Sequence, residues 1–498
     1  MNLWANLSLG FSLTFQPQNL LATVLGQVIG VIVGILPGIN ASMAVSILLP
    51  LSFGLPPVTA LMLLAGIYMG TMYGGSITSI LMRVPGTSTA AVICLDGYEL
   101  TRQGRAGLAL GITAIGSFIA GTFSLLVLMT LAPTLARAAL AFAPPEYFAL
   151  IFFGLLAIAG LESGGVVRGL ISGCFGLLLG TIGLDPVTGV ARFTFGRIEL
   201  LDGIDFVAVL IGLFAVSQAL INLERTRPID LYKGRLTGML PKWREFWESF
   251  GAICRGSILG TIIGILPGVG ATTAAFLSYS MEARLARDKS RVGKGDLKCV
   301  AGPGSADNAA AGGSLVPMLS LGIPGSETTA VLLGVLMIHG IQPGPLLFTK
   351  NADLVWGLIA SLWLANFLGF ALATLGVRPL TQVLRLPAPI MSAFILVTGF
   401  IGAYALNNNI ADVWVALVFG ILGYVMRRVD LPMAPLILGL VLGPLAEKSF
   451  RQSMALSRGN PMIFFTRPIT AALLGVGLAS VIIPFFWHLL RRHYKEAK

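Results

Sequence analysis

The first 82 residues contain no Asp, Glu, Lys or Arg, and Arg83 is the first charged side chain of the chain. An uncharged, mostly apolar stretch of this length has to lie in lipid or deep inside protein. The rest of the chain agrees, since only 11% of its 498 residues are charged, against roughly 25% in soluble domains. The chain is therefore predicted to be an all-α polytopic membrane protein, which excludes a soluble enzyme and a fibrous or disordered protein.

The net charge of +11 fits basic residues gathered in cytoplasmic loops. No basic domain outside the membrane is present to bind nucleic acid, so no nucleic-acid partner is expected. The four cysteines are far apart and lack a CxxC spacing, and the three histidines form no set with them. We therefore expect no transition-metal site and no cofactor.

Short motifs recur in the same order in two halves of the chain, which is the signature of an internal repeat. The recurring motifs are GILPG at 34–38 and 264–268, GGS at 74–76 and 312–314, and VPGT at 84–87 beside IPGS at 323–326. The halves are predicted to cover 1–222 and 250–445. A cytoplasmic linker is expected at 223–249, and a loop, one C-terminal helix and a cytoplasmic tail at 446–498.

Each half is predicted to contain a re-entrant hairpin followed by a discontinuous helix, because Pro-Gly interrupts apolar stretches that are too short to span alone. The hairpins are placed at 20–51 and 250–282, and the broken helices at 57–95 and 297–340. The remaining helices, at 106–222 and 352–445, would form a scaffold. Helices broken at mid-membrane within inverted repeats are typical of secondary transporters.

The positions of the basic residues favour one orientation of these inverted repeats. If the N-terminus is periplasmic and the C-terminus cytoplasmic, the inside segments hold 23 of the 33 Lys and Arg residues and the outside segments hold 8. One segment fits poorly, because 445–468 is placed outside and carries four basic residues.

The breaks offer two kinds of ligand. Helix N-termini at mid-membrane suit a substrate carboxylate, and freed carbonyls with hydroxyl and amide oxygens suit Na⁺ or, as the alternative, H⁺. Helix capping is the competing explanation for any single hydroxyl. The predicted substrate-binding residues are Asn40, Ser42, Arg83, Thr87, Ser88, Ser326 and Thr328. The predicted cation-binding residues are Gly38, Thr89, Gly268, Asp307, Asn308, Glu327 and Thr329.

Three charged residues near the breaks carry open alternatives. Asp307 either starts a helix or binds a cation or substrate, since carboxylates inside a membrane are functional candidates by default. Glu327 stabilises a helix dipole, binds a cation or pairs with Arg83. Arg83 either snorkels to the membrane surface, pairs with Glu327 or holds a substrate carboxylate.

Enzyme motifs such as HExxH, a P-loop and a nucleophile elbow are missing from the sequence, so the protein is not expected to be an enzyme. A membrane-embedded enzyme acting on a lipid-linked substrate and a passive channel stay as the alternatives to a transporter. The enzyme would need clustered titratable groups on facing helices, and the channel would need no ion gradient.

These motifs resemble the large membrane subunit of the tripartite tricarboxylate transporters, the TctA family. The resemblance covers nearly the whole chain and includes GILPGINASMAV (34–45), YMGTMYGGSITSIL (68–81), VPGTSTAAV (84–92), GLDPVTGVARFTFG (183–196), GILPGVGATTAA (264–275) and DNAAAGGSLVPMLSLGIPGS (307–326). It implies uptake of tri-, di- or aromatic carboxylates across the bacterial cytoplasmic (inner) membrane, driven by an ion gradient that is typically Na⁺. It also implies two partners, a small membrane subunit and a periplasmic substrate-binding protein. Movement of the hairpins and broken helices as an elevator-like unit is the favoured mechanism, with rocking as the alternative.

Overall fold

The computed structural model describes residues 3–161, 165–185, 188–224, 238–382 and 388–496. Nearly all of its regular structure is helical. The described strands are β1 (Gly183–Leu184) and β2 (Ala191–Arg192), which have two residues each and pair antiparallel. Seven helical segments among the described residues are long and apolar enough to cross a membrane: Pro17–Ile35, Pro57–Met82, Ala106–Ala139, Phe206–Glu224, Ala352–Leu375, Pro389–Asn407 and Ile410–Arg428. The helical membrane class predicted from the sequence is therefore confirmed.

The first half begins with a helix that the sequence analysis did not predict, α1 (Leu3–Thr14), which packs against α16 (Ala352–Leu375). The elements that follow are α2 (Pro17–Ile35), α3 (Ala41–Leu48), η1 (Leu49–Ser52), α4 (Pro57–Met82), η2 (Thr89–Ala91), α5 (Ile93–Arg102), α6 (Ala106–Ala139), α7 (Pro144–Leu161), α8 (Val166–Leu179), η3 (Ile198–Leu200), α9 (Phe206–Leu210), the π-helix η4 (Ile211–Val216) and α10 (Ser217–Glu224). The expected hairpin at 20–51 is occupied by α2 and α3, and the expected broken helix at 57–95 is occupied by α4, η2 and the start of α5.

The second half repeats this pattern of elements. It contains α11 (Trp243–Ile265), α12 (Gly270–Leu285), η5 (Lys289–Arg291), α13 (Lys298–Leu321), α14 (Glu327–Ile338), α15 (Leu347–Lys350), α16, α17 (Val377–Leu380), α18 (Ala388–Asn407), α19 (Ile410–Arg428), α20 (Ala434–Leu456), α21 (Ile463–Thr466) and α22 (Pro468–Glu496). Two boundaries differ from the prediction: α11 begins inside the expected linker, and α20 runs on where a loop was expected after residue 445. Residues 225–237 of the expected linker lie outside the described residues.

Glycines spaced four residues apart bring α2 against α4 and α11 against α13. A Cβ atom added at Gly34 would lie 2.5 Å from the carbonyl oxygen of Thr71, and one added at Gly264 would lie 2.4 Å from that of Ala310. Such close backbone contact is typical of small-residue packing between membrane helices. The same contacts occur at Gly26 and Gly30 in α2 and at Gly256 and Gly260 in α11.

These contacts align the two halves residue by residue. Gly74 packs on Val31 and Gly313 packs on Thr261, while Gly34 and Gly264 occupy matched places. Residues of α2 and α3 therefore match residues 230 positions later, and residues of α4 and its break match residues 239 positions later. The GGS motifs at 74–76 and 312–314 imply a register of 238 residues, which is wrong by one residue. The contacts of Gly74 and Gly313 with the neighbouring helices give 239 residues.

The breaks in the two halves have the same backbone geometry. α2 ends at Leu36 with φ −74° and ψ 118°, and α11 ends at Leu266 with φ −74° and ψ 121°. Gly38 and Gly268 follow with φ of 86° and 77°, which is left-handed backbone that favours glycine. The turn separates two helices in each half, so the two glycines are required where the motif places them.

The two halves are tied together at one end by a buried carboxylate. Asp96 of α5 accepts hydrogen bonds from the backbone N–H groups of Gly293, Gly295 and Asp296 and from the hydroxyl of Tyr279 at 2.8–3.1 Å. Its side chain has no exposed area. These four donors satisfy a charge whose burial would otherwise be costly.

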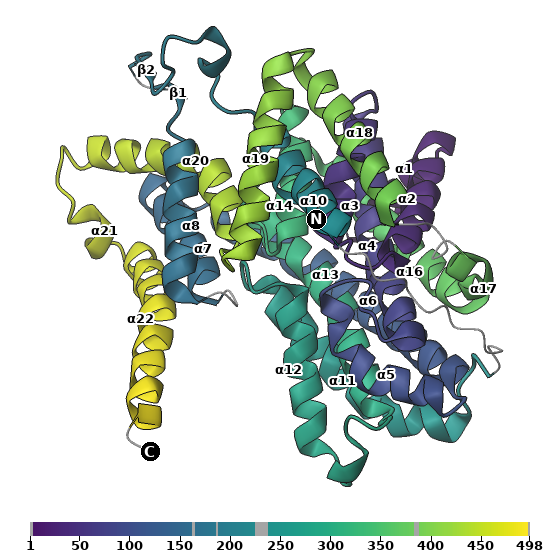
Figure 1. Cartoon of the computed structure of the whole chain (residues 1–498). Helices are drawn as coiled ribbons and strands as arrows, with labels where there is room; N and C mark the ends of the chain where they lie inside the picture. The colour runs from purple at the N-terminus through teal and green to yellow at the C-terminus, as the bar shows by residue number, and fades with distance from the viewer. Residues whose placement is uncertain (1–2, 162–164, 186–187, 225–237, 383–387, 497–498) are drawn as a thin grey trace.

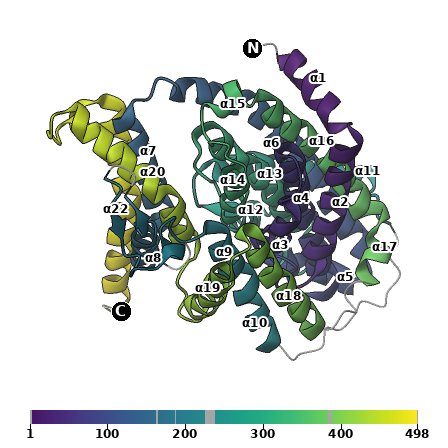
Figure 2. The same ribbon diagram turned by 90° about the horizontal axis from the view of Figure 1, so that it is seen from above.

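A smaller group of helices stands to one side of the main body. Figure 1 and Figure 2 show α7 and α8 with α20 and α22 at the left, apart from the helices around α4 and α13. The group is fastened by ion pairs, among them Glu146 with Arg467 at 2.6 Å and Asp185 with Arg451 at 2.8 Å. The start of α20 reaches back to the main body, where Ala434 and Leu436 join the large apolar core.

Candidate functional site

The four helix breaks converge on one cavity of about 280 Å³ in the main body. Its wall comes from the start of α3, the middle of α4, the segment after α4, the turn between α11 and α12, and the start of α14. Met72 and Ala434 add two apolar side chains to this wall. The lining residues are Asn40, Ala41, Ser42, Tyr68, Met72, Thr87, Ser88, Thr89, Gly268, Val269, Gly270, Ala271, Thr272, Thr273, Ser326, Glu327, Thr328 and Ala434.

Most of the predicted substrate-binding residues lie on this wall. They are Asn40, Ser42, Thr87, Ser88, Ser326 and Thr328. Among the predicted cation-binding residues, Thr89, Gly268 and Glu327 also line the cavity, whereas Gly38, Asp307, Asn308 and Thr329 do not. The breaks therefore bring together residues that are up to 288 positions apart in the sequence.

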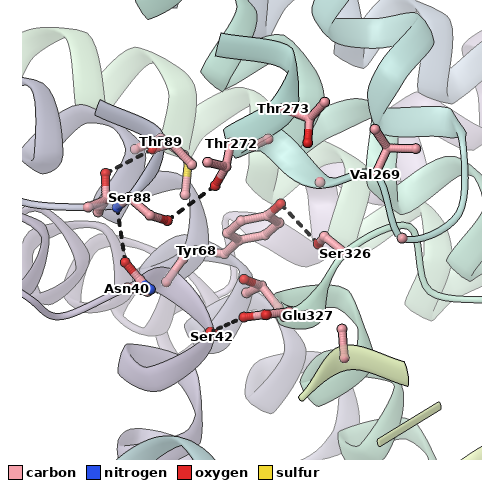
Figure 3. A pocket seen from close by; sticks show the side chains of 18 residues that line it. Asn40, Ser42, Tyr68, Ser88, Thr89, Val269, Thr272, Thr273, Ser326 and Glu327 are labelled. Carbon is pink, nitrogen blue, oxygen red and sulfur yellow. Dashed lines mark hydrogen bonds between the residues drawn. The ribbon is translucent and has the colours of Figure 1, made fainter. Parts of the chain in front are cut away.

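Two hydrogen bonds in the cavity wall join the halves at matched positions (Figure 3). Ser42 of α3 donates to Oε2 of Glu327 in α14 at 3.2 Å. The Oγ atom of Ser88 lies 3.2 Å from Oγ1 of Thr272 in α12. Each bond joins the first turn of the second hairpin helix in one half to the break of the other half, so the cavity wall closes only when both halves are present.

The helix caps show which hydroxyls have a structural role. Ser326 is the N-cap of α14, and its Oγ accepts from the backbone N–H of Thr329 at 3.3 Å. In return the Thr329 hydroxyl accepts from the Ser326 N–H at 2.8 Å, which is the reciprocal arrangement of a capping box. Asn40 precedes α3 without capping it, and its Oδ1 accepts instead from the Ser88 backbone N–H at 3.0 Å.

Each broken helix also sends one polar side chain from its middle to the break of the other half. The Tyr68 hydroxyl of α4 lies 3.4 Å from Oγ of Ser326 and 3.2 Å from Oγ of Ser314. Oδ2 of Asp307 in α13 accepts from the Thr89 hydroxyl at 2.9 Å. Tyr68 and Asp307 occupy matched positions, 239 residues apart.

Asp307 and Asn308 leave acceptor oxygens unused behind the cavity wall. Both residues are fully buried in α13. Within the described residues, Oδ1 of Asp307 and Oδ1 of Asn308 have no hydrogen-bond partner. Buried oxygens without a partner are costly, and carboxylate and amide oxygens are the ligands that a hard cation takes. Thr89 joins Asp307 to the cavity, because it lines the wall and donates to Asp307.

Arg83 is not where the sequence analysis placed it. Its side chain is exposed, its guanidinium lies over the Tyr98 ring at 6.0 Å, and it is absent from the cavity wall. The alternative in which Arg83 pairs with Glu327 is not seen in the described chain, where Glu327 accepts from Ser42 and Arg83 ends α4 in left-handed backbone with φ 56°. The matched residue in the second half is Gly322, with φ 74°.

The sequence analysis missed several wall residues. Tyr68 and Met72 lie in the middle of an uninterrupted apolar helix, where no break draws attention to them, and Ala434 comes from the peripheral helices. A signal for Tyr68 existed, since it stands opposite Asp307 when the halves are aligned 239 residues apart. No group of three or more His, Cys, Asp or Glu side chains in the described part of the chain is placed to hold a metal ion.

Comparison with known proteins gives two curated relatives, both from Agrobacterium vitis. The first, an uncharacterized 52.8 kDa protein in the TAR-I ttuC' 3'region, is 44% identical over 97% of this chain and 96% of its own length. The second, an uncharacterized protein in the TAR-II ttuC' 3'region, is 44% identical over 45% of this chain and 93% of its own length. No solved structure matches the chain.

A family model matches a region of the chain that contains every residue lining the cavity. The match is to the tripartite tricarboxylate transporter TctA family and extends over residues 20–438. It includes most of α2, the helices from α3 to α5, those from α11 to α14 and the start of α20. The chain therefore belongs to the TctA family of the tripartite tricarboxylate transporters.

Proposed function

We propose that this protein is the large membrane subunit of a binding-protein-dependent transporter that imports carboxylates by symport with Na⁺. The observation that carries the proposal is the single cavity on which all four helix breaks converge, in a chain that belongs to a transporter family. The partners are a small membrane subunit and a periplasmic substrate-binding protein. The location is the bacterial cytoplasmic membrane.

The coupling ion binds between Asp307, Asn308 and Thr89. Support comes from the two buried oxygens without a partner and from the Thr89 hydroxyl at 2.9 Å from Asp307. Na⁺ prefers oxygen ligands of this kind where helices are broken. A bound cation there would neutralise the carboxylate one side chain behind the cavity wall and so favour entry of an anionic substrate.

The mechanism that best fits the packing is an elevator-like movement. The hairpins and broken helices form a continuous unit, because α2 packs on α4 and α11 packs on α13 through glycine contacts. Four hydrogen bonds connect the α2–α4 pair and the segment after it with the second-half elements: those of Tyr68 with Ser326, Thr89 with Asp307, Ser42 with Glu327 and Ser88 with Thr272. The cavity would then travel with the unit, while α16, α18 and α19 belong to the scaffold.

The orientation places the N-terminus in the periplasm and the C-terminus in the cytoplasm, with the two halves inverted. Its support is the distribution of basic residues, including the six in 283–298. Replacing Lys289 by Cys in a cysteine-free background gives the test. Labelling from outside intact cells should fail and labelling of inverted vesicles should succeed, and the opposite result would reverse the topology.

Uptake of radiolabelled carboxylates by the reconstituted three-component transporter tests the function itself. A symporter concentrates the substrate only when a Na⁺ gradient points inward, and an imposed pH gradient alone has no such effect. Equal flux without any gradient would identify a passive channel. Chemical conversion of the substrate without accumulation would identify a membrane enzyme, and accumulation driven by the pH gradient would assign the coupling to H⁺.

A further inference from the structure

The cavity has two matched parts of its wall, one formed by Ser42 and Glu327 and the other by Thr272 and Ser88. Only the first part carries an ionisable side chain. Positions 42 and 272 match, and so do positions 88 and 327. On one wall Ser42 donates to the carboxylate of Glu327, and on the other Ser88 and Thr272 form a hydroxyl pair at the same spacing of 3.2 Å. The second half thus has a built-in carboxylate where the first half has a hydroxyl.

Glu327 makes its wall unfavourable for an anion. It is the only acidic or basic residue on the cavity wall of the described chain. The positive charge of Arg427 acts on it, but Arg427 does not line the cavity and donates to the side chain of Gln218. The ionised form of Glu327 would repel a substrate carboxylate placed here, and such a juxtaposition is costly in a desolvated site.

The opposite wall offers neutral donors to an anion. The Ser88 backbone N–H is bonded to Oδ1 of Asn40, so the amide N–H₂ group of Asn40 is left for a ligand in the cavity. The hydroxyls of Ser88 and Thr272 stand beside it (Figure 3). Thr272 also belongs to the first turn of the 16-residue helix α12, whose positive dipole end adds to the attraction.

We propose that the cavity selects a monocarboxylate whose far end carries a hydrogen-bond donor. This proposal rests on the function proposed above and narrows its substrate class. The carboxylate binds Asn40, Ser88 and Thr272, and the donor binds the carboxylate of Glu327. A cavity of about 280 Å³ corresponds to roughly nine liquid water volumes, so the substrate is a small organic acid.

Three four-carbon probes separate the contributions of the two ends. They are 4-hydroxybutyrate, succinate and butyrate, and binding is measured by titration calorimetry with the detergent-purified full chain in saturating Na⁺. We expect 4-hydroxybutyrate to bind best, with butyrate weaker for lack of the donor. Succinate should bind about tenfold or more weaker than 4-hydroxybutyrate because its second carboxylate meets Glu327.

Substitution of Glu327 gives the decisive comparison. Glu327→Gln keeps an oxygen that accepts from Ser42 and removes the charge, so the preference for 4-hydroxybutyrate over succinate should fall by about tenfold or more. The matched variant Ser88→Glu places a carboxylate on the other wall and should abolish binding of 4-hydroxybutyrate. Thermal unfolding without ligand verifies that both variants are folded, and Thr272→Val provides a second, uncharged way to weaken the same wall.

The outcomes distinguish this inference from the proposed function. Succinate binding as tight as that of 4-hydroxybutyrate in the unaltered protein, or an unchanged preference in Glu327→Gln, overturns the inference. Failure of all three probes to bind, while the assembled transporter still accumulates a carboxylate, overturns it as well and leaves the function standing. If the assembled transporter accumulates no carboxylate at all, the proposed function itself fails.

Discussion

The two halves of the molecule share one backbone plan and differ in the side chains that the plan brings together. α2 and α11 end in the same backbone conformation and contact their partners through glycines at matched positions. Yet Tyr68 in the first half stands where Asp307 stands in the second, and Ser88 stands where Glu327 stands. The backbone of the site is thus duplicated, while Glu327 on the cavity wall and Asp307 directly behind Thr89 both belong to the second half.

The hairpins show the same division between shared geometry and different chemistry. α3 has 8 residues and α12 has 16. The longer arm is held to α11 by a bidentate ion pair in which Arg255 donates to Glu282 at 2.8 and 2.6 Å. The matched residues of the first half are Leu25 and Ser52, which cannot form an ion pair. The Pro-Gly motif therefore sets the same turn geometry in both halves, whereas the contacts that hold the two helices beside each turn differ between the halves.

Loss of the ion pair should have the largest effect. Arg255→Ala leaves the Glu282 side chain, which is 1% exposed, buried without its partner, and we expect the free energy of unfolding to fall by about 3 kcal/mol. Thermal unfolding of the detergent-purified protein measures this change. The double variant Arg255→Leu/Glu282→Leu should recover most of the loss, and an unaffected single variant would show that α12 does not depend on the pair.

The second prediction concerns the carboxylate that only the second half has. Asp307→Asn removes the charge behind Thr89 and should weaken the apparent affinity for the coupling ion by about 2 kcal/mol, or roughly thirtyfold. The Na⁺ concentration for half-maximal uptake is the quantity to measure. Tyr68→Phe is the control at the matched position and should leave this concentration nearly unchanged, so equal shifts in both variants would end the distinction between the halves.

The third prediction tests what the halves share. Alanine at Gly34 or at Gly264 would place a Cβ atom 2.5 or 2.4 Å from a carbonyl oxygen of the neighbouring helix, which forces the helices apart. Each variant should lose about 2 kcal/mol of stability, and the two losses should be similar. Gly475→Ala is the control, since nothing lies within 4 Å of its added Cβ. Unequal losses in thermal unfolding would show that one helix pair is the more tolerant.

The smallest effect is expected where α4 and α13 end. Both helices stop in left-handed backbone, at Arg83 and at Gly322, but only glycine adopts this conformation without strain. Arg83→Gly should therefore raise the free energy of unfolding by about 1 kcal/mol, and uptake should continue. Gly322→Ala should lower it by a similar amount. Loss of uptake in a stable Arg83→Gly protein would restore the role of Arg83 as a substrate clamp.

Much of the fold could be predicted because its signals are local. The uncharged start required a membrane environment, and each Pro-Gly motif marked a helix break because proline and glycine act on their own stretch of backbone. The candidate site followed in part, since polar side chains beside breaks were expected to face a common cavity, and Asn40, Ser88 and Ser326 do so. Tyr68 escaped notice because nothing local distinguishes a tyrosine within a long apolar helix.

The sequence by itself determined the membrane class, the duplication and the places where the helices break, because composition and backbone preference act through neighbouring residues. Only the tertiary structure decided which side chains meet across the halves. It joined Ser42 to Glu327 and Thr89 to Asp307, and it turned Arg83 away from the cavity. The physical reason is that such contacts depend on the register between packed helices, which the glycine-to-carbonyl contacts fix to a single residue and which no pattern within one helix contains.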